Sequence, residues 1–182
     1  MRAEDSTRVD QSQPLILGRG ILEVPRFEPL TLAWSAKGLV RIQFGEEPLA
    51  GEEVPIPAEF SDPLLRYFAG QRERFAGVRL DLHGTAFQLK VWNALCAIPY
   101  GEVRSYAAIA NAVGSPRATR AVGGANGLNP VPIIVPCHRV VEATMRLGGF
   151  SSGLPRKRTL LAIEGVQVQS DIVHPGQLSL IS

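Results

Sequence analysis

The sequence predicts two domains of different classes. Residues 1–77 are expected to form an α/β domain with a small β-sheet and a helix. Residues 78–182 are expected to form a mainly α-helical domain with a winged-helix-like helix-turn-helix. Near Arg79 the apolar pattern changes from strand-like runs to helical spacing. The charge balance changes too, from 9 basic and 12 acidic residues before this point to 10 and 5 after it.

Strand-like segments dominate the first part of the chain after a polar start. Residues 1–14 lack an apolar signal-peptide core and are expected to be disordered. From residue 15 to residue 44 the chain holds strand-like runs rich in β-branched and aromatic residues, with "SAKG" as a hairpin turn. The acidic, proline-rich residues 45–60 predict a loop. A short helix is expected next, capped by Asp62 and with Pro63 in its first turn.

Three short helices are predicted in the second part of the chain. The first follows Thr85 as its cap and has apolar residues at helical spacing. The second begins at its cap Ser105 and ends at Gly114. The third has Pro116 and Arg117 in its first turn. Short helices joined by a tight glycine-containing turn form a helix-turn-helix, and the third helix occupies the position of a recognition helix.

The third helix has an unusual surface of small residues with one long cationic side chain, Arg120. Small residues let a helix backbone approach another surface closely. Together with the basic charge of residues 78–182, this favours an anionic partner such as nucleic acid. The alternatives are a solvated basic surface and a helix face that packs against protein. The small residues are Ala118, Ala121, Gly123, Gly124 and Ala125.

The cysteine and histidine content excludes several classes of site. Cys96 and Cys137 are too few for a disulfide framework. No CxxC pair occurs, and residues 1–77 contain neither cysteine nor histidine, so we expect no metal and no cofactor.

No apolar run is long enough to span a bilayer. We therefore expect a cytoplasmic protein without a membrane partner.

The stretch "IIVPCHRVV", residues 133–141, concentrates reactive groups at the end of an apolar run. A cysteine is a nucleophile only as the thiolate, and an unperturbed thiol with a pKa of roughly 8.5 is mostly protonated at neutral pH. His138 can accept the proton of Cys137, directly or through water. It then needs an acidic partner, for which sequence spacing leaves five candidates. These are Glu164, Asp81, Glu102, Glu142 and Asp171. The alternative is that Cys137 is a small buried hydrophobe, as we expect for Cys96.

The segment "NPVPIIVPCHRVV" resembles the active-site motif of the methylated-DNA–protein-cysteine methyltransferases, the O6-alkylguanine-DNA alkyltransferase family. Further motifs of that family occur in its order and at its spacing, over roughly residues 80–168. They are "FQLKVWNAL", "IPYGEVRSYAAIA", "RAVGGA" and "LLAIEG". Residues 1–77 fit the variable N-terminal domain of the family only loosely.

The resemblance implies a DNA repair protein that flips O6-alkylguanine out of duplex DNA and moves the alkyl group irreversibly onto its own cysteine. It implies Cys137 as the acceptor, His138 as its base through a bound water, Glu164 as the partner of His138 and Tyr106 as a proton donor to the guanine. Arg120 would fill the gap left in the base stack. The implied DNA-binding surface adds Ser105, Ala121, Gly123, Gly124 and Asn126, and the implied substrate pocket consists of Asn129, Pro132, Val140, Phe150, Ser151, Ser152 and Lys157.

Two positions depart from the family pattern, where many members have Tyr-x-Gly-Gly. Phe150 replaces the tyrosine and Ser152 replaces a glycine, which leaves the accepted alkyl size and activity on O4-alkylthymine open. We expect a monomer, with Arg139 bracing the domains or the pocket wall rather than touching DNA. The main alternative is a non-catalytic alkyltransferase-like damage sensor, but those proteins have another residue at the cysteine position. A cysteine hydrolase and a sequence-specific regulator fit the motif order and the third helix less well.

Overall fold

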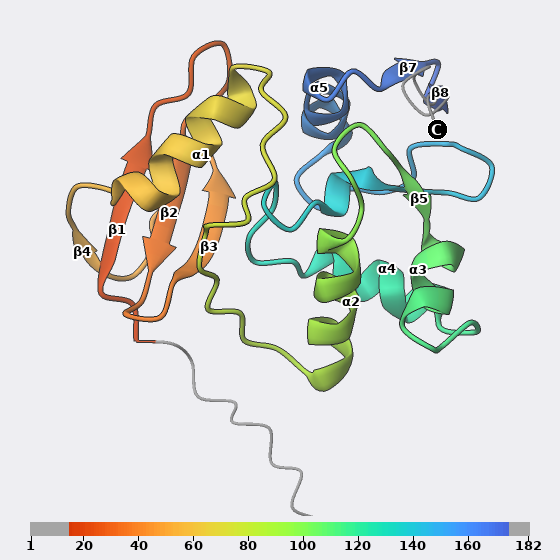
Figure 1. Cartoon of the computed structure of the whole chain (residues 1–182), viewed down its shortest axis with the longest axis horizontal. Helices are drawn as coiled ribbons and strands as arrows, with labels where there is room; N and C mark the ends of the chain where they lie inside the picture. Colours follow the sequence, from red (N-terminus) through yellow and green to blue (C-terminus); the bar gives the residue numbers. More distant parts are fainter. Residues whose placement is uncertain (1–14, 175–182) are drawn as a thin grey trace, which may run out of the picture.

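The computed structural model describes residues 15–174, so the predicted disorder of residues 1–14 lies outside the described residues. Figure 1 shows a sheet with one helix on one side of the molecule and a group of short helices on the other. The sheet contains β1 (Gly18–Leu22), β2 (Leu30–Trp34), β3 (Leu39–Phe44) and β4 (Glu52–Glu53), in the order β3-β2-β1-β4. Its neighbouring strands are antiparallel except for the parallel pair β1 and β4.

The predicted hairpin turn is present at residues 35–38. The linker that leaves this domain packs against it. Leu39 donates a backbone hydrogen bond to Arg79 at 2.8 Å, and Asp81 donates one to Leu39 at 2.9 Å. A Cβ atom on Gly38 would lie 2.5 Å from the Arg79 carbonyl oxygen. Only glycine therefore permits this close approach of the linker to the turn.

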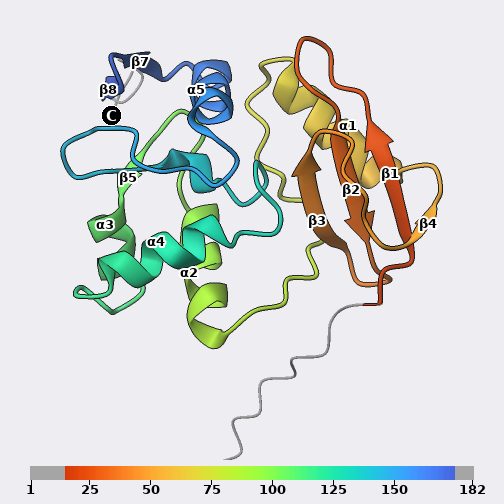
Figure 2. The ribbon, with the colours of Figure 1, turned by 180° about the vertical axis from the view of Figure 1, so that it is seen from behind.

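Helix α1 (Ala58–Phe68) covers one face of the sheet, as the two opposite views in Figures 1 and 2 show. The predicted start of this helix was wrong, because it begins before Asp62 and encloses Pro63. The physical reason is burial: Phe60, Leu64 and Tyr67 lie on one face and are each at most 1% exposed. Including Phe60 extends this apolar stripe by one turn, which outweighs a cap at Asp62. The predicted loop over residues 45–60 is also interrupted by β4.

The second domain begins with the predicted helices. In α2 (Ala86–Cys96), the Thr85 hydroxyl and the Gln88 side chain form a reciprocal capping box. Helix α3 (Tyr106–Ala112) is capped by the Ser105 hydroxyl, which accepts from the Ala108 amide. The third helix, α4 (Thr119–Gly127), starts later than predicted. Pro116 and Arg117 instead occupy a turn closed by a hydrogen bond from the Ala118 amide to the Ser115 carbonyl.

Short strands and a further helix complete this domain around the cysteine. A 3-10 turn, η1 (Cys137–Arg139), leads into β6 (Val140–Val141), which pairs in parallel with β5 (Arg104–Ser105). Helix α5 (Leu154–Ile163) follows, and a hairpin of β7 (Gln167–Gln169) and β8 (Ile172–His174) ends the described chain. The predicted fold class is confirmed, with an α/β domain followed by a mainly helical one.

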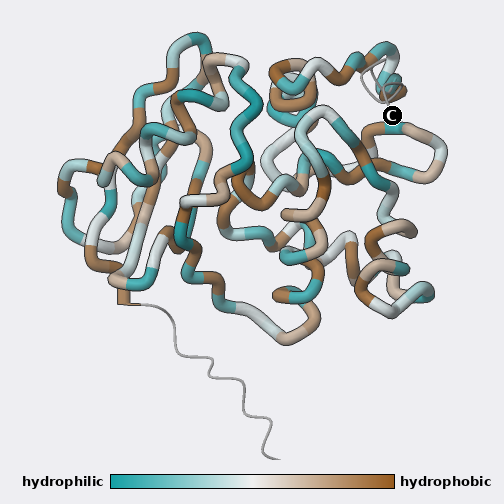
Figure 3. The backbone as a smooth tube through the Cα atoms, viewed as in Figure 1, coloured by the Kyte–Doolittle hydropathy of each residue, from teal (hydrophilic) through white to brown (hydrophobic). Residues whose placement is uncertain are grey.

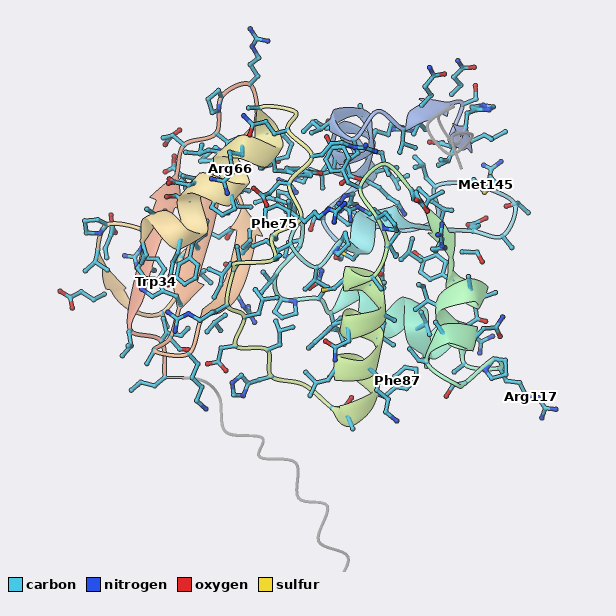
Figure 4. All side chains as sticks on the ribbon, in the orientation of Figure 1. Trp34, Arg66, Phe75, Phe87, Arg117 and Met145 are labelled. Carbon is cyan, nitrogen blue, oxygen red and sulfur yellow. The ribbon has the colours of Figure 1, made fainter. Side chains whose placement is uncertain are left out.

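One hydrophobic core runs through both domains. It joins residues of the sheet and α1 to residues of α2, α4 and the segment before Cys137. Figure 3 shows hydrophobic residues recurring along the strands and helices of both domains. Phe75 lies between the two domains in Figure 4 and belongs to this core. Within residues 15–174 no helix is both long and apolar enough to cross a bilayer.

Candidate active site

Cys137 lies at the end of a buried segment, where its side chain is 2% exposed. Asn129 holds this position, because its amide nitrogen donates to Cys137 Sγ at 3.0 Å and to the Val135 carbonyl at 2.7 Å. The Asn129 amide oxygen accepts from the Val131 backbone at 3.1 Å. Both the nitrogen and the oxygen of the Asn129 amide are thus hydrogen-bonded. The side chain therefore fixes the turn before Cys137 and directs a hydrogen-bond donor at the sulfur.

His138 and Glu164 form a buried pair beside the cysteine. His138 Nε2 lies 2.7 Å from Glu164 Oε1, and both side chains are at most 2% exposed. The other ring nitrogen, Nδ1, is buried and has no hydrogen-bond partner within the part of the chain that the structure describes. Nδ1 is thus free to accept a proton, while Glu164 orients the ring from the opposite side.

The other four acidic candidates lie elsewhere. Asp81 accepts from Ser35 and contacts His83 in the linker. Glu102 pairs with Arg104 at the surface. Glu142 is exposed and accepts from Thr144. Asp171 pairs with Arg158. Of the five carboxylates that sequence spacing left open, Glu164 is the one that contacts His138.

Arg139 braces the same carboxylate and is only 6% exposed. Its Nε and Nη2 atoms donate to both oxygens of Glu164 at 2.9–3.2 Å, and its Nη1 donates to the Ile98 carbonyl at 2.6 Å. The Gly101 amide adds a further donor to Glu164 Oε2 at 3.1 Å. Arg139 therefore ties the active-site carboxylate to the end of α2 and points away from solvent.

Burial and hydrogen bonding determine which groups of the site are charged at rest. Burial raises the pKa of Cys137 to about 11, although the Asn129 hydrogen bond and the Lys157 charge act to lower it. Burial also lowers the pKa of His138, against the opposing effect of Glu164. Burial acts to raise the pKa of Glu164, but the hydrogen bonds from His138 and Arg139 and the charge of Arg139 prevail and hold it at about 2. At neutral pH the site therefore contains a thiol, a neutral imidazole and a carboxylate.

Lys157 is a buried cation that holds the backbone next to the site. Its ammonium is fully buried and donates to the carbonyls of Val140, Leu147 and Gly149. Burial lowers its pKa to about 8. Lys157 thus joins β6 to the loop at residues 147–149, and the carbonyl of Val140, one of the expected pocket residues, is engaged here.

A cavity of about 720 Å³ lies between α4, Tyr106 and this loop. The Tyr106 hydroxyl donates to the Gly149 carbonyl at 3.3 Å and marks one wall. Arg120 and Arg117 line the cavity from the α4 side, and Figure 4 shows Arg117 extending away from the body of the molecule. Ala121 and Gly124 are exposed on α4, and Gly123 is half-buried and lines the cavity.

One expected DNA contact needs correction. Asn126 is 4% exposed and donates to the Cys137 carbonyl at 3.4 Å, so it faces the core rather than the outer face of α4. Val122 lies one turn earlier on the same buried face. The Ser105 hydroxyl is half-buried and serves the α3 cap.

The remaining pocket candidates differ in exposure, and among the described residues none of their side chains has a hydrogen bond to Cys137. Pro132 is buried, Phe150 is half-buried against the core, and Ser151 is exposed. Ser152 and Pro132, together with Asn129, line a second cavity of about 390 Å³ between the two domains. The Ser152 carbonyl accepts from Arg156, whose guanidinium also binds Glu28 of the first domain at 2.5 and 2.6 Å. Sequence reasoning missed this bridge and the contact of Tyr67 with Glu164.

Comparisons with known proteins identify the family. A model described as 6-O-methylguanine DNA methyltransferase, DNA binding domain, matches residues 86–166, and a model for the ribonuclease-like domain of the same protein matches residues 20–82. A methylated-DNA–protein-cysteine methyltransferase of Mycobacterium bovis is 49% identical over 150 residues, which cover 79% of this chain and 90% of the relative. A Methanosarcina barkeri enzyme of the same name is 44% identical over 155 residues, covering 79% and 94%.

Solved structures agree. The crystal structure of Mycobacterium tuberculosis OGT in complex with DNA has a TM-score of 0.74 at 43% identity and covers 91% of this chain and 100% of that one. An O6-methylguanine-DNA methyltransferase from Pyrococcus kodakaraensis has a TM-score of 0.57 at 26% identity, covering 84% and 100%. The chain therefore belongs to the 6-O-methylguanine DNA methyltransferase family.

Proposed function

We propose that Cys137 is the residue that accepts the alkyl group and that His138 and Glu164 activate it. The activity of the chain is the repair of O6-methylguanine in DNA by methyl transfer to a protein cysteine, as its membership of this family and its 49% identity to a methylated-DNA–protein-cysteine methyltransferase support. The observation that carries our assignment is the buried pair of His138 and Glu164 next to Cys137, with His138 Nδ1 left free.

The thiol must lose its proton as it attacks, because burial holds it protonated at rest. The proton passes from Sγ through a water to His138 Nδ1, and the Glu164 carboxylate stabilises the resulting imidazolium. An S–C bond forms between Cys137 Sγ and the alkyl carbon as the bond from that carbon to guanine O6 breaks. The guanine leaves as an anion and takes a proton, so the net proton transfer is from the thiol to the base.

Tyr106 is suited to pass that proton on: its hydroxyl protonates the departing guanine, and the resulting phenolate regains a proton from the His138 imidazolium through water, so the thiol proton ends on the base. Its hydroxyl lies at the wall of the cavity, and burial together with Cys137 and Glu142 raises its pKa above the ordinary value, which keeps it protonated. The thioether left on Cys137 has no acidic proton and no route back to a thiol in this site. Each chain therefore repairs one lesion.

A guanine inside a duplex hides its O6 substituent, so the base must leave the stack at a cost of a few kcal/mol. Arg120 lies exposed at the α4 side of the cavity, where its side chain can fill the gap and offset part of that cost. The small exposed residues Ala121 and Gly124 suit close approach of α4 to a narrow minor groove, where little sequence information is available. A repair protein that acts wherever damage occurs needs only such weak sequence preference.

The partner is duplex DNA that carries O6-alkylguanine, and the chain acts as a monomer. Phe150 and Ser152, where the chain departs from the family pattern, are the residues we expect to determine which alkyl groups fit: Phe150 packs against the core that contains Cys137, and Ser152 lines the second cavity together with Asn129. O4-alkylthymine duplexes belong in the same assay as a second substrate class.

The test is intact-mass spectrometry with peptide mapping after incubation with an O6-methylguanine duplex. We expect one added methyl group per chain, on Cys137, and no further increase with excess duplex. Cys137→Ala should bind the duplex and gain no methyl group, whereas the matched variant Cys96→Ala should react like the wild type. Binding of the lesion without any adduct on the wild-type chain would instead indicate a non-catalytic damage sensor.

A further inference from the structure

A tyrosine of the first domain reaches the catalytic centre. Tyr67 lies near the end of α1 and is fully buried. Its hydroxyl donates to Glu164 Oε1 at 2.9 Å across 97 positions of sequence. The same hydroxyl lies 3.5 Å from His138 Nε2 and 3.4 Å from the Leu160 carbonyl, both longer than an ordinary hydrogen bond. The contact with Glu164 is therefore its main interaction.

The carboxylate of Glu164 is surrounded by donors on both oxygens. Oε2 accepts from Arg139 and from the Gly101 amide. Oε1 accepts from His138 and Arg139 as well as from Tyr67. Among the described residues, Tyr67 is the donor to this carboxylate that comes from the first domain, and it binds the same oxygen as His138.

We infer that Tyr67 is a positioning residue for alkyl transfer, which holds Glu164 Oε1 in line with His138 Nε2 and makes the first domain part of the catalytic unit. This inference rests on the role of His138 and Glu164 proposed above. Tyr67 touches neither Cys137 nor the substrate, so it acts only through the carboxylate.

The chemistry of the hydroxyl fits a fixed donor. Burial, with Glu164 as the second cause, raises the pKa of Tyr67 well above the ordinary value, so the phenol keeps its proton throughout the working pH range. A permanent donor on Oε1 withdraws negative charge from the side that faces His138. It therefore limits how strongly Glu164 raises the basicity of the imidazole, besides fixing the direction of the carboxylate.

Aromatic packing fixes the position of the hydroxyl in turn. The Tyr67 ring contacts Phe68, Phe75 and Tyr100, with ring centroids 5.3, 5.7 and 6.0 Å away. Phe75 and Tyr100 come from the chain that leaves the first domain and from the end of α2. The ring is thus held by both domains, and only its oxygen contacts the carboxylate.

The test compares Tyr67→Phe with Tyr100→Phe. Each variant loses a single hydroxyl at the domain junction, but the Tyr100 hydroxyl donates to the Ile163 carbonyl at 2.8 Å and not to Glu164. Single-turnover transfer from an O6-methylguanine duplex is measured against pH, together with duplex affinity and thermal unfolding. The Tyr67→Phe rate should fall roughly tenfold, which corresponds to about 1.4 kcal/mol, with duplex affinity unchanged.

The pH profile separates positioning from a purely structural effect. Without the Tyr67 hydroxyl, Glu164 Oε1 becomes more negative towards His138, so the limb of the profile that reports His138 should move to higher pH. A move to lower pH would also support the inference, because it would mean that the carboxylate has turned away from the ring. An unmoved profile with a rate equal to that of Tyr100→Phe would overturn it.

A double-mutant cycle tests the route through Glu164. If Tyr67 acts only through this carboxylate, Tyr67→Phe should cause no further loss of rate in a Glu164→Gln background. Additive losses would overturn the inference. Nitrogen chemical shifts of His138 in the resting protein give a readout that needs no transfer: they should change in Tyr67→Phe and not in Tyr100→Phe. This keeps a failure of the inference distinct from a failure of the proposed function, which the adduct on wild-type Cys137 tests.

Discussion

Replacing Glu164 by Gln should weaken both the fold and the chemistry, and the loss of stability should depend on pH. The carboxylate is 2% exposed and its pKa is depressed from 4.5 to about 2. At about 1.4 kcal/mol per pKa unit, this depression corresponds to roughly 3 kcal/mol of stability when the group is ionised. A similar figure follows from the buried charge of Arg139, because removing one partner of a buried ion pair costs about 3–5 kcal/mol.

The sign of the pH dependence follows from the depressed pKa. The stabilisation is fully present above the unfolded pKa of about 4.5 and is lost as pH falls through the folded pKa of about 2. Urea unfolding should therefore show Glu164→Gln to be roughly 3 kcal/mol less stable than the wild type at pH 7, with the gap narrowing below pH ~4.5. Methyl transfer should fall at least ~100-fold, because general-base assistance contributes about 10²–10⁴-fold.

Glu102→Gln is the matched control. Glu102 pairs with Arg104 at 2.7 Å, but both side chains are more than a third exposed, so this surface ion pair contributes at most about 1 kcal/mol. If Glu164→Gln lost no more stability than this control, or if its loss did not change between pH 7 and the acid range, the carboxylate would not be held ionised by His138 and Arg139.

Two further predictions concern Arg120 and the resting thiols. Arg120→Ala should slow repair of duplex DNA more than transfer from free O6-benzylguanine, because the side chain is expected to act on the base stack and not on the reacting atoms; equal losses in single-turnover assays with the two substrates would contradict that role. Cys96, which we expected to be a small buried hydrophobe, is instead exposed at the last residue of α2, so at pH 7 iodoacetamide should label Cys96 before Cys137. Labelling of Cys137 should keep rising towards pH ~11, since burial raises the pKa of Cys137 to about 11. Peptide mapping over a pH series checks this, and preferential labelling of Cys137 at neutral pH would mean a thiolate at rest.

Local signals predicted much of the second domain. The helix caps Thr85 and Ser105 could be predicted because each bonds a residue only three positions further along the chain. The fold class could be predicted from the change near Arg79 from strand-like apolar runs to apolar residues at helical spacing. The start of α1 was mispredicted because it depends on the burial of Phe60 against the sheet, which no local signal reports. Asn126 was assigned to the DNA-binding surface but is buried, and a polar side chain that bonds a buried carbonyl resembles a surface residue in the sequence.

The charged network around Cys137 could be predicted only in part. Residue chemistry identified Cys137 and His138 and reduced the acids to five, and the family resemblance selected Glu164. The contacts of Tyr67 with Glu164 and of Glu28 with Arg156 join positions 97 and 128 apart. Such contacts depend on how the domains pack, and neither Tyr67 in an apolar helix face nor Glu28 between two strands differs in sequence from an ordinary core or surface residue.

The buried network gives a physical basis for the single-turnover reaction proposed at Cys137. A resting thiolate would react with any small electrophile, and each such event would consume one chain. Burial keeps Cys137 protonated and His138 neutral, so the resting site is not nucleophilic. In the proposed mechanism the ionised Glu164, held by Arg139 and Tyr67, stabilises the imidazolium only when the proton moves. Burying these charges can lower the stability of the fold, and in the proposed mechanism this cost confines reactivity to the moment when an alkylated base reaches Cys137.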